Sequence, residues 1–165
     1  MLQISAASAQ WFLPFVVPVC LYVCWSDMRA MKIPNRAVLA LLGIFLAVGL
    51  VALPLAEYPW RLVQLAVVLA LGIVLNAAGV MGAGDAKFAA AAAPFIHPGD
   101  MRFLIALFAA VLLAAFVSHR LVRATPLRRL APDWESWPRG RDFPMGLALG
   151  GTLAAYLALG AVWGS

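Results

Sequence analysis

Charged side chains are scarce in this 165-residue sequence, because Asp, Glu, Lys and Arg make up only 12% of it. Soluble proteins contain about 25% of these residues. Apolar residues make up 65% of the chain, and the mean hydropathy is +0.95. A soluble domain of this size would expose much of that apolar surface to water, whereas lipid accepts it without penalty. The composition therefore predicts a membrane protein and argues against a soluble helical bundle.

Cysteine is also scarce, with only Cys20 and Cys24 present. The two residues are one helical turn apart in an apolar stretch, and no second cysteine pair exists to complete a metal site. We therefore expect both to pack as small apolar side chains, without a disulfide, a bound metal or another cofactor.

A positively charged segment is missing from the start of the chain, where the first charged residue is Asp27. Secretory signal peptides begin with such a segment, so residues 1–26 do not match that pattern. We expect the first apolar span to be retained.

Basic residues exceed acidic ones by twelve to seven, which gives a net charge of +5. Most of them lie in two clusters next to apolar segments, and no stretch combines them with a solvent-facing aromatic platform. We therefore expect no nucleic-acid partner and interpret the clusters as signals of membrane topology.

Six apolar segments can be distinguished, and a helical span needs about 20 residues. They cover residues 11–26, 37–56, 60–81, 86–98, 103–118 and 143–163, the fourth and fifth being short. Proline, glycine and acidic residues mark turns between the second and third segments and between the fourth and fifth. The sequence predicts an all-α membrane bundle of about six transmembrane helices, forming one domain over residues 1–165.

The basic residues predict how this bundle is oriented. Only Arg61 and Arg102 fall on one side of the membrane, and ten fall on the other: Arg29, Lys32, Arg36, Lys87, Arg120, Arg123, Arg128, Arg129, Arg139 and Arg141. The positive-inside rule places the larger group in the cytoplasm and both termini outside. Residues 119–142 are expected to form a basic, weakly structured cytoplasmic loop with Trp134 and Trp137 as interfacial anchors; a partner site is the alternative.

Two carboxylates, Asp27 and Asp85, are not explained by topology. The other acidic residues lie in outer turns, as Glu57 and Asp100 do, or beside arginines. Two spans separate Asp27 from Asp85, so both are expected at the same face of the membrane. Residues 86–98 would cover about 20 Å as a helix, against a hydrocarbon core of about 30 Å, which places Asp85 below the surface. An ionisable group at that depth suggests function.

Each carboxylate also has a structural interpretation. Asp85 follows the glycines of "GAGD" and could cap the alanine-rich helix that comes next. Asp27 could form an interfacial pair with Arg29 or Lys32. Lys87 could extend to the interface or act electrostatically near Asp85.

Taken together, the two carboxylates also fit a chemical function. Two carboxylates in a low-dielectric site share a proton, so one can activate water while the other protonates a substrate carbonyl. This is the chemistry of aspartyl peptide hydrolysis. Gly82 and Gly84 would let an extended substrate strand approach Asp85 closely, since neither has a Cβ. The alanine tract 89–93 is expected to allow close helix packing around the pair.

At these residues the sequence resembles the type IV prepilin peptidases, which are membrane aspartyl peptidases of the G-x-G-D class. The first matching motif is "DMRAMKIPN", with Asp27, Pro34 and Asn35, and the second is "GAGDAKF", with Gly82, Gly84, Asp85 and Lys87. The chain is most similar to the short form that serves tight-adherence (Flp-type) pili.

The resemblance implies that the protein cleaves the leader peptide of prepilin or pseudopilin substrates at the cytoplasmic face of the bacterial inner membrane. Asp27 and Asp85 would be the catalytic pair, and the lipid bilayer would surround the helical bundle. Long members also methylate the new amino terminus and carry C-x-x-C motifs between their first two spans. Here residues 27–36 contain no cysteine, so we expect neither a zinc site nor methylation. Many relatives have a second proline after the one that opens the last span, whereas Leu147 and Ala148 follow Gly146 here.

The same sequence features are compatible with other functions. A G-x-G-D peptidase with another substrate, of the preflagellin or signal-peptide type, would share the same motifs. A small transporter or proton-relay protein also uses carboxylates within the membrane, although these are usually distributed through the bilayer. A non-catalytic assembly factor is the remaining alternative.

Overall fold

The computed structural model describes residues 1–139 and 142–165, so Arg141 of the predicted basic group lies outside the described residues. Within them the chain is all-helical, as the composition predicts. Its α-helices are α1 (Ala6–Ala30), α2 (Asn35–Ala52), α3 (Tyr58–Ala77), α4 (Ala83–Ala92), α5 (Met101–Ala124) and α6 (Met145–Trp163). Short 3-10 helices follow α4, precede α5 and follow α5, and these are η1 (Ala93–Phe95), η2 (Pro98–Asp100) and η3 (Pro126–Leu130).

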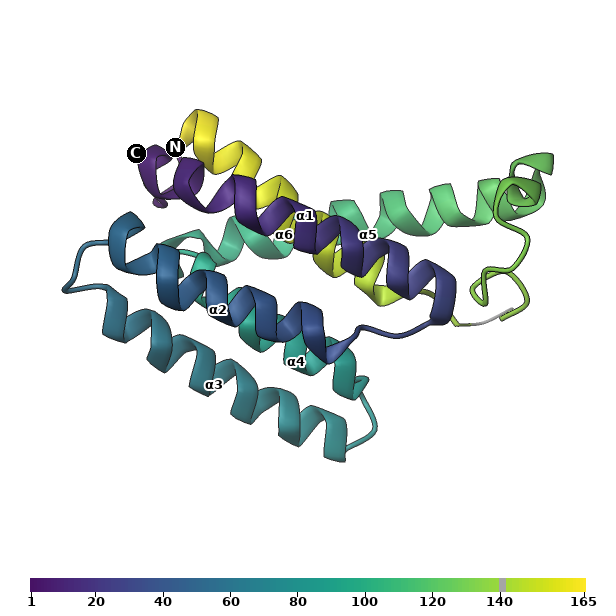
Figure 1. Ribbon diagram of the computed structural model, residues 1–165, viewed down its shortest axis with the longest axis horizontal. Coiled ribbons are helices and arrows are strands. Elements are labelled where there is room, and N and C mark those ends of the chain that lie inside the picture. The colour runs from purple at the N-terminus through teal and green to yellow at the C-terminus, as the bar shows by residue number, and fades with distance from the viewer. Residues whose placement is uncertain (140–141) are drawn as a thin grey trace.

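The six α-helices lie along the long axis of the molecule, and each runs opposite to the one before it (Figure 1). Within the described residues, five segments are long and apolar enough to cross a membrane: α1, α2, α3, α6, and η2 together with α5. The fourth segment is short, as expected, because α4 has only ten residues before it tightens into η1. The expected polytopic helical bundle is confirmed.

The expectation of a short fifth span is wrong. Helix α5 has 24 residues and continues to Ala124, past residue 119, where the sequence suggested that a loop begins. Hydropathy detects only the lipid-compatible part of a helix, whereas polar residues such as Arg120 and Arg123 continue the helical backbone without difficulty. As a result, α5 extends beyond the ends of α2, α3 and α4 (Figure 1).

Helix α1 carries clear start and stop signals. It begins after Ser5, whose hydroxyl accepts a hydrogen bond from the N–H of Ser8, and it ends at Met31, which has a left-handed backbone (φ 50°). Pro14 and Pro18 lie inside the helix. Such prolines are tolerated in membrane helices, where neighbouring groups satisfy the freed backbone carbonyls.

The two termini meet at one end of the bundle (Figure 1). The N–H of Leu2 donates to the carbonyl of Trp163 at 3.1 Å, and the N–H of Ser165 donates to the carbonyl of Leu2 at 3.0 Å. Six α-helices of alternating direction place both termini at the same end, and these hydrogen bonds join them there. The end that carries both termini is called the terminal end below, and the opposite end is called the charged end.

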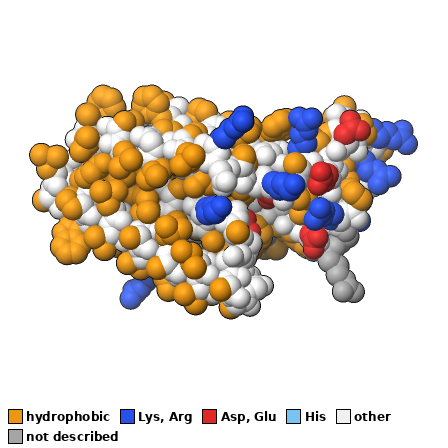
Figure 2. All heavy atoms as spheres, turned by 60° about the horizontal axis from the view of Figure 1, so that its bottom comes forward, with side chains coloured by type: hydrophobic (Ala, Val, Ile, Leu, Met, Phe, Trp, Pro, Cys, Tyr) orange, Lys and Arg blue, Asp and Glu red, His pale blue; other side chains and the backbone are white. Residues whose placement is uncertain are grey.

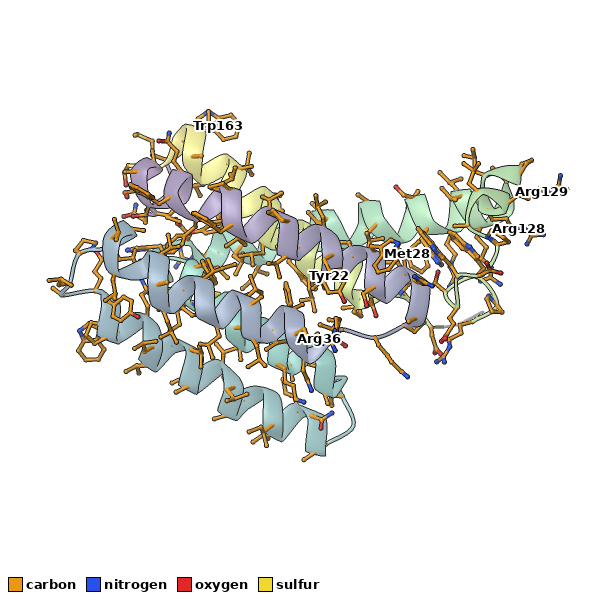
Figure 3. All side chains as sticks on the ribbon, viewed as in Figure 1. Tyr22, Met28, Arg36, Arg128, Arg129 and Trp163 are labelled. Carbon is orange, nitrogen blue, oxygen red and sulfur yellow. The ribbon has the colours of Figure 1, made fainter. Side chains whose placement is uncertain are left out.

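Charged side chains gather at the charged end, whereas apolar side chains cover most of the remaining surface (Figure 2). Arg128 and Arg129 lie at this end, far from Trp163 at the terminal end (Figure 3). Cytoplasmic ends of membrane proteins are rich in Lys and Arg, so the charged end is the one that the sequence predicts to face the cytoplasm.

An aromatic cluster fills the core where the first four helical segments meet. The ring of Phe95 in η1 lies edge-on to Phe12 of α1 and to Phe45 of α2, with centroid distances of 4.9 and 5.6 Å. Phe45 also stacks on Tyr58 at 5.3 Å. These contacts hold the end of the short fourth segment between α1, α2 and α3.

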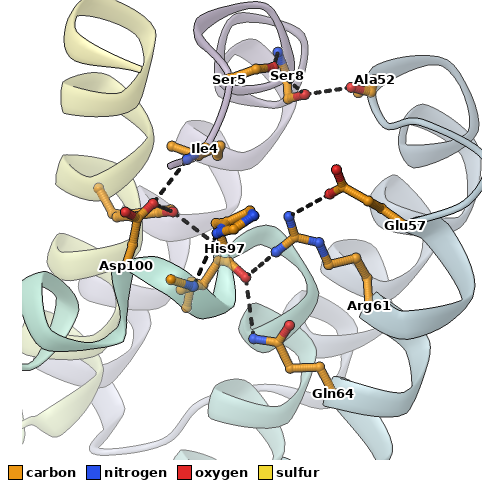
Figure 4. Close-up of polar contacts among 12 residues, drawn as sticks. Ile4, Ser5, Ser8, Ala52, Glu57, Arg61, Gln64, His97 and Asp100 are labelled. Carbon is orange, nitrogen blue, oxygen red and sulfur yellow. Dashed lines mark hydrogen bonds and ion pairs between the residues drawn. The ribbon is translucent and has the colours of Figure 1, made fainter. Parts of the chain in front are cut away.

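A buried polar network closes the terminal end (Figure 4). The Asp100 carboxylate accepts hydrogen bonds from the N–H groups of Gln3 (2.7 Å) and Ile4 (3.0 Å) and from the hydroxyl of Tyr156 (2.7 Å). Its side chain is only 4% exposed. The sequence suggested a simple turn residue, but the fold places Asp100 where the N-terminal segment, η2 and α6 meet.

A second buried charge lies nearby, on α3. Arg61 donates to the carbonyl of Ile96 and to the carboxylate of Glu57, and Gln64 donates to the same Ile96 carbonyl at 3.2 Å (Figure 4). These bonds satisfy the carbonyl of Ile96, which follows η1 and has no hydrogen-bond donor from a further helical turn.

Candidate active site

Asp27 lies near the end of α1 and is 5% exposed. Its Oδ2 accepts a hydrogen bond of 2.6 Å from the N–H of Gly146. This N–H belongs to the first turn of α6, where backbone N–H groups have no partner within their own helix and where the helix dipole favours a negative charge.

The alternative interpretation, a surface ion pair of Asp27 with Arg29 or Lys32, is wrong. In the part of the chain that the structure describes, Asp27 forms no ion pair. The guanidinium of Arg29 lies over the ring of Trp25 instead, 5.1 Å from its centroid. The Asp27 carboxylate faces the packed interior because α6 supplies its hydrogen-bond donor there.

Asp85 is the third residue of α4, and the expectation that it caps this helix is also wrong. The capping position belongs to Gly82, which has an extended backbone (φ −64°, ψ 143°). The Asp85 carboxylate lies close above this glycine, since a Cβ on Gly82 would be 2.7 Å from Oδ2. It accepts no hydrogen bond from the described residues, so it remains available to a ligand.

Asp27 and Asp85 line the same pocket, which has a volume of about 370 Å³. The remaining walls come from the α1–α2 connection, the glycine turn before α4 and the segment that leads into α6: Met31, Lys32, Ile33, Gly82, Ala83, Gly84, Phe143 and Met145. The fold thus brings together two carboxylates that are far apart in sequence.

The other residues of the two motifs hold the walls of this pocket in place. Gly84 packs closely against Ile33. A Cβ on Gly84 would lie only 3.4 Å from the Cβ of Ile33. Pro34 caps the start of α2 with an extended backbone. The Lys87 ammonium donates to Oδ1 of Asn35 at 3.3 Å and does not pair with Asp85. This bond joins α4 to the first residue of α2.

Sequence reasoning did not identify the contribution of α6. The pocket includes Phe143 and Met145, and Gly146 donates the hydrogen bond to Asp27. The segment "FPMG" was visible as a helix start with a glycine. However, no local pattern indicates which distant side chain such a helix start will contact.

Residues 135–137, between α5 and α6, are more closely packed than expected. The N–H groups of Glu135 and Ser136 donate to the last carbonyls of α1, those of Arg29 (2.9 Å) and Met28 (3.3 Å). Trp137 is only 8% exposed and stacks on His119 with a centroid distance of 5.1 Å, so it is no interfacial anchor. This segment therefore supports the end of the helix that carries Asp27.

The profile of the type IV leader peptidase family matches residues 15–119. The chain belongs to this family. No curated protein and no solved structure matches it significantly. Membership in the type IV leader peptidase family supports a leader-peptidase-like protease, and the apolar helices fit a multi-pass membrane protein. The matched range includes Asp27 and Asp85 but ends before α6.

Proposed function

We propose that this type IV leader peptidase is an aspartic endopeptidase that cleaves the leader peptide of prepilin-like substrates at the cytoplasmic face of the bacterial inner membrane. Asp27 and Asp85 are its catalytic pair. The observation that supports this most strongly is the single pocket lined by both carboxylates within the family-matched range.

The pair supplies the acid and the base that peptide hydrolysis requires. One carboxylate accepts a proton from water, whose oxygen then bonds to the scissile carbonyl carbon, while the other carboxyl group donates its proton to the carbonyl oxygen. Collapse of the tetrahedral intermediate breaks the C–N bond, and the leaving amine takes a proton from the pair. The sum of these steps is the addition of one water molecule.

The position of the pocket fits a substrate with one apolar helix. Such a helix would lie in the lipid against the apolar surface of the bundle, and its cytoplasmic end would reach the charged end of the molecule (Figure 2). The leader junction would then enter the pocket between the α1–α2 connection and the turn that contains Gly82 and Gly84.

The first prediction is that Asp27→Asn and Asp85→Asn each reduce leader cleavage by about a thousandfold or more, because each removes the acid or the base. The test co-expresses a prepilin with each variant and separates precursor from mature pilin on a gel. Asp133→Asn is the matched control, since it makes the same chemical change at an exposed position. It should process normally.

Normal processing by either pocket variant would overturn the assignment of the pair. The substrate class is tested separately, with purified wild-type protein in detergent and a prepilin, a preflagellin or an unrelated signal peptide. Cleavage of only the latter two would contradict the prepilin proposal while leaving the peptidase chemistry intact.

A further inference from the structure

We infer that Gly146 is a positioning residue for Asp27, acting through its backbone N–H and through its lack of a side chain. This inference rests on the proposed function, because it takes Asp27 to be part of the catalytic pair. The family match ends at residue 119 and assigns no role to any residue of α6.

The hydrogen bond fixes one oxygen of the carboxylate and leaves the other free. The Gly146 N–H lies 2.6 Å from Oδ2 of Asp27 and has no partner within α6, since it belongs to the first turn. Oδ1 of Asp27 accepts no hydrogen bond from any residue in the described ranges. With Asp27 lining the pocket, Oδ1 is the oxygen left to meet water or substrate.

The approach of α6 to Asp27 requires glycine at position 146. A Cβ there would be 2.9 Å from the Cβ of Asp27, which is closer than real Cβ contacts, and 3.0 Å from its Oδ2. The Cβ of Asp27 is attached directly to the backbone, so a rotation of the side chain cannot relieve this contact. Any larger residue at 146 must therefore displace α1 or α6 and move the carboxylate.

Gly150 provides a matched control in the same helix pair. It lies one turn further along α6, and a Cβ there would be 2.9 Å from the carbonyl oxygen of Cys20 and from Sγ of Cys24. Alanine at position 150 therefore crowds the contact between α1 and α6 as severely as alanine at position 146. It does so without touching Asp27.

The test measures kcat and KM for prepilin cleavage by the full-length protein in detergent, together with its thermal unfolding. Gly146→Ala should lower kcat about a hundredfold with little change in KM, because displacing a reacting group by about 1 Å costs this much. Gly150→Ala should lower the unfolding temperature to a similar extent and keep a kcat close to that of wild type. Equal losses of kcat in the two variants would overturn the inference, since helix packing alone would then explain them.

A second variant covers the case in which Gly146→Ala does not fold. Replacing the amide between Met145 and Gly146 by an ester removes the N–H donor and adds no side chain. Losing one hydrogen bond to a carboxylate should lower kcat about tenfold. A wild-type kcat in the ester variant would overturn the positioning role.

The two proposals can fail separately. Wild-type cleavage by Asp27→Asn would overturn the proposed function, whatever the Gly146 variants do. Loss of cleavage in Asp27→Asn together with a wild-type kcat in the ester variant would overturn only the role of Gly146.

Discussion

Three buried or half-buried aspartates of this protein differ in the hydrogen bonds that they accept. Asp100 accepts three, from two backbone N–H groups and the hydroxyl of Tyr156. Asp27 accepts one, on Oδ2, and Asp85 accepts none from the described residues. A carboxylate with all its partners in the protein contributes to structure, whereas one with free oxygens in a pocket can bind a ligand or transfer a proton. This difference separates Asp100 from the pair that we propose to be catalytic.

The role of Asp100 can be tested by substitution. Asp100→Ala should lower the free energy of unfolding by about 3 kcal/mol, because it leaves the buried N–H of Ile4 and the part-buried N–H of Gln3 unpaired. Tyr156→Phe removes one of the three donors to Asp100 and also the acceptor of the His97 N–H, and should cost about 2 kcal/mol. Denaturant unfolding in detergent measures both values. Folded Asp100→Ala protein should still cleave its substrate, and a selective loss of cleavage without destabilisation would contradict a structural role.

At the scale of elements, the position of α4 depends on small residues. The helix approaches α3 where Gly72 meets Ala86, since a Cβ on Gly72 would be only 3.0 Å from the Cβ of Ala86. The alanines that follow, Ala90 to Ala93, are buried, as expected for a tract that allows close packing. Because Ala86 is the neighbour of Asp85, the contact between α3 and α4 also sets where that carboxylate lies.

We therefore predict that Gly72→Ala destabilises the protein and slows cleavage. Separating α3 from α4 should cost about 1–3 kcal/mol of unfolding free energy, and a displaced Asp85 should reduce kcat about tenfold or more. Gly43→Ala is the control, because a Cβ on Gly43 would meet nothing within 4 Å. Thermal unfolding and cleavage kinetics measure both effects. A fully active Gly72→Ala protein would show that Asp85 does not depend on this contact.

At the scale of the whole molecule, the structure fixes which segments share an end. Leu2 and Trp163 meet at the terminal end, and the pocket lies at the charged end. Neither fact shows which end faces the cytoplasm. That assignment comes from the gathering of Lys and Arg at the charged end and the positive-inside rule.

Cysteine labelling tests the assignment in cells. In a background with Cys20→Ala and Cys24→Ala, a membrane-impermeant maleimide applied from outside the inner membrane should label Ser165→Cys. It should label Arg129→Cys only after that membrane is permeabilised, because the charged end is predicted to face the cytoplasm. The reverse pattern would invert the topology and place the pocket outside.

Several features of the fold follow from the sequence alone for simple physical reasons. Apolar runs identify helices because lipid cannot satisfy exposed backbone groups. The parity of the crossings places Asp27 and Asp85 at one end without any knowledge of packing. The extent of α5 does not follow, since hydropathy does not detect the polar last turns at Arg120 and Arg123.

Some residues of the candidate site can also be identified from the sequence, whereas others cannot. Asp27, Asp85, Gly82 and Gly84 are identifiable from spacing and residue type, because chemistry in a membrane requires unusual residues there. Gly146 is not identifiable in this manner. A glycine near the start of a helix has many uses, and its partner lies more than a hundred residues earlier in the chain.

The class of protein and the shared end of the bundle at which Asp27 and Asp85 lie can be deduced from the amino-acid sequence. These properties depend on the free energy of transfer between water and lipid, which each segment sets for itself. Which residues touch at that end, such as Asp27 with Gly146 and Lys87 with Asn35, is known only from the folded arrangement of the helices. Such contacts depend on how closely helices approach, and that distance is set by the volumes of side chains from distant parts of the chain.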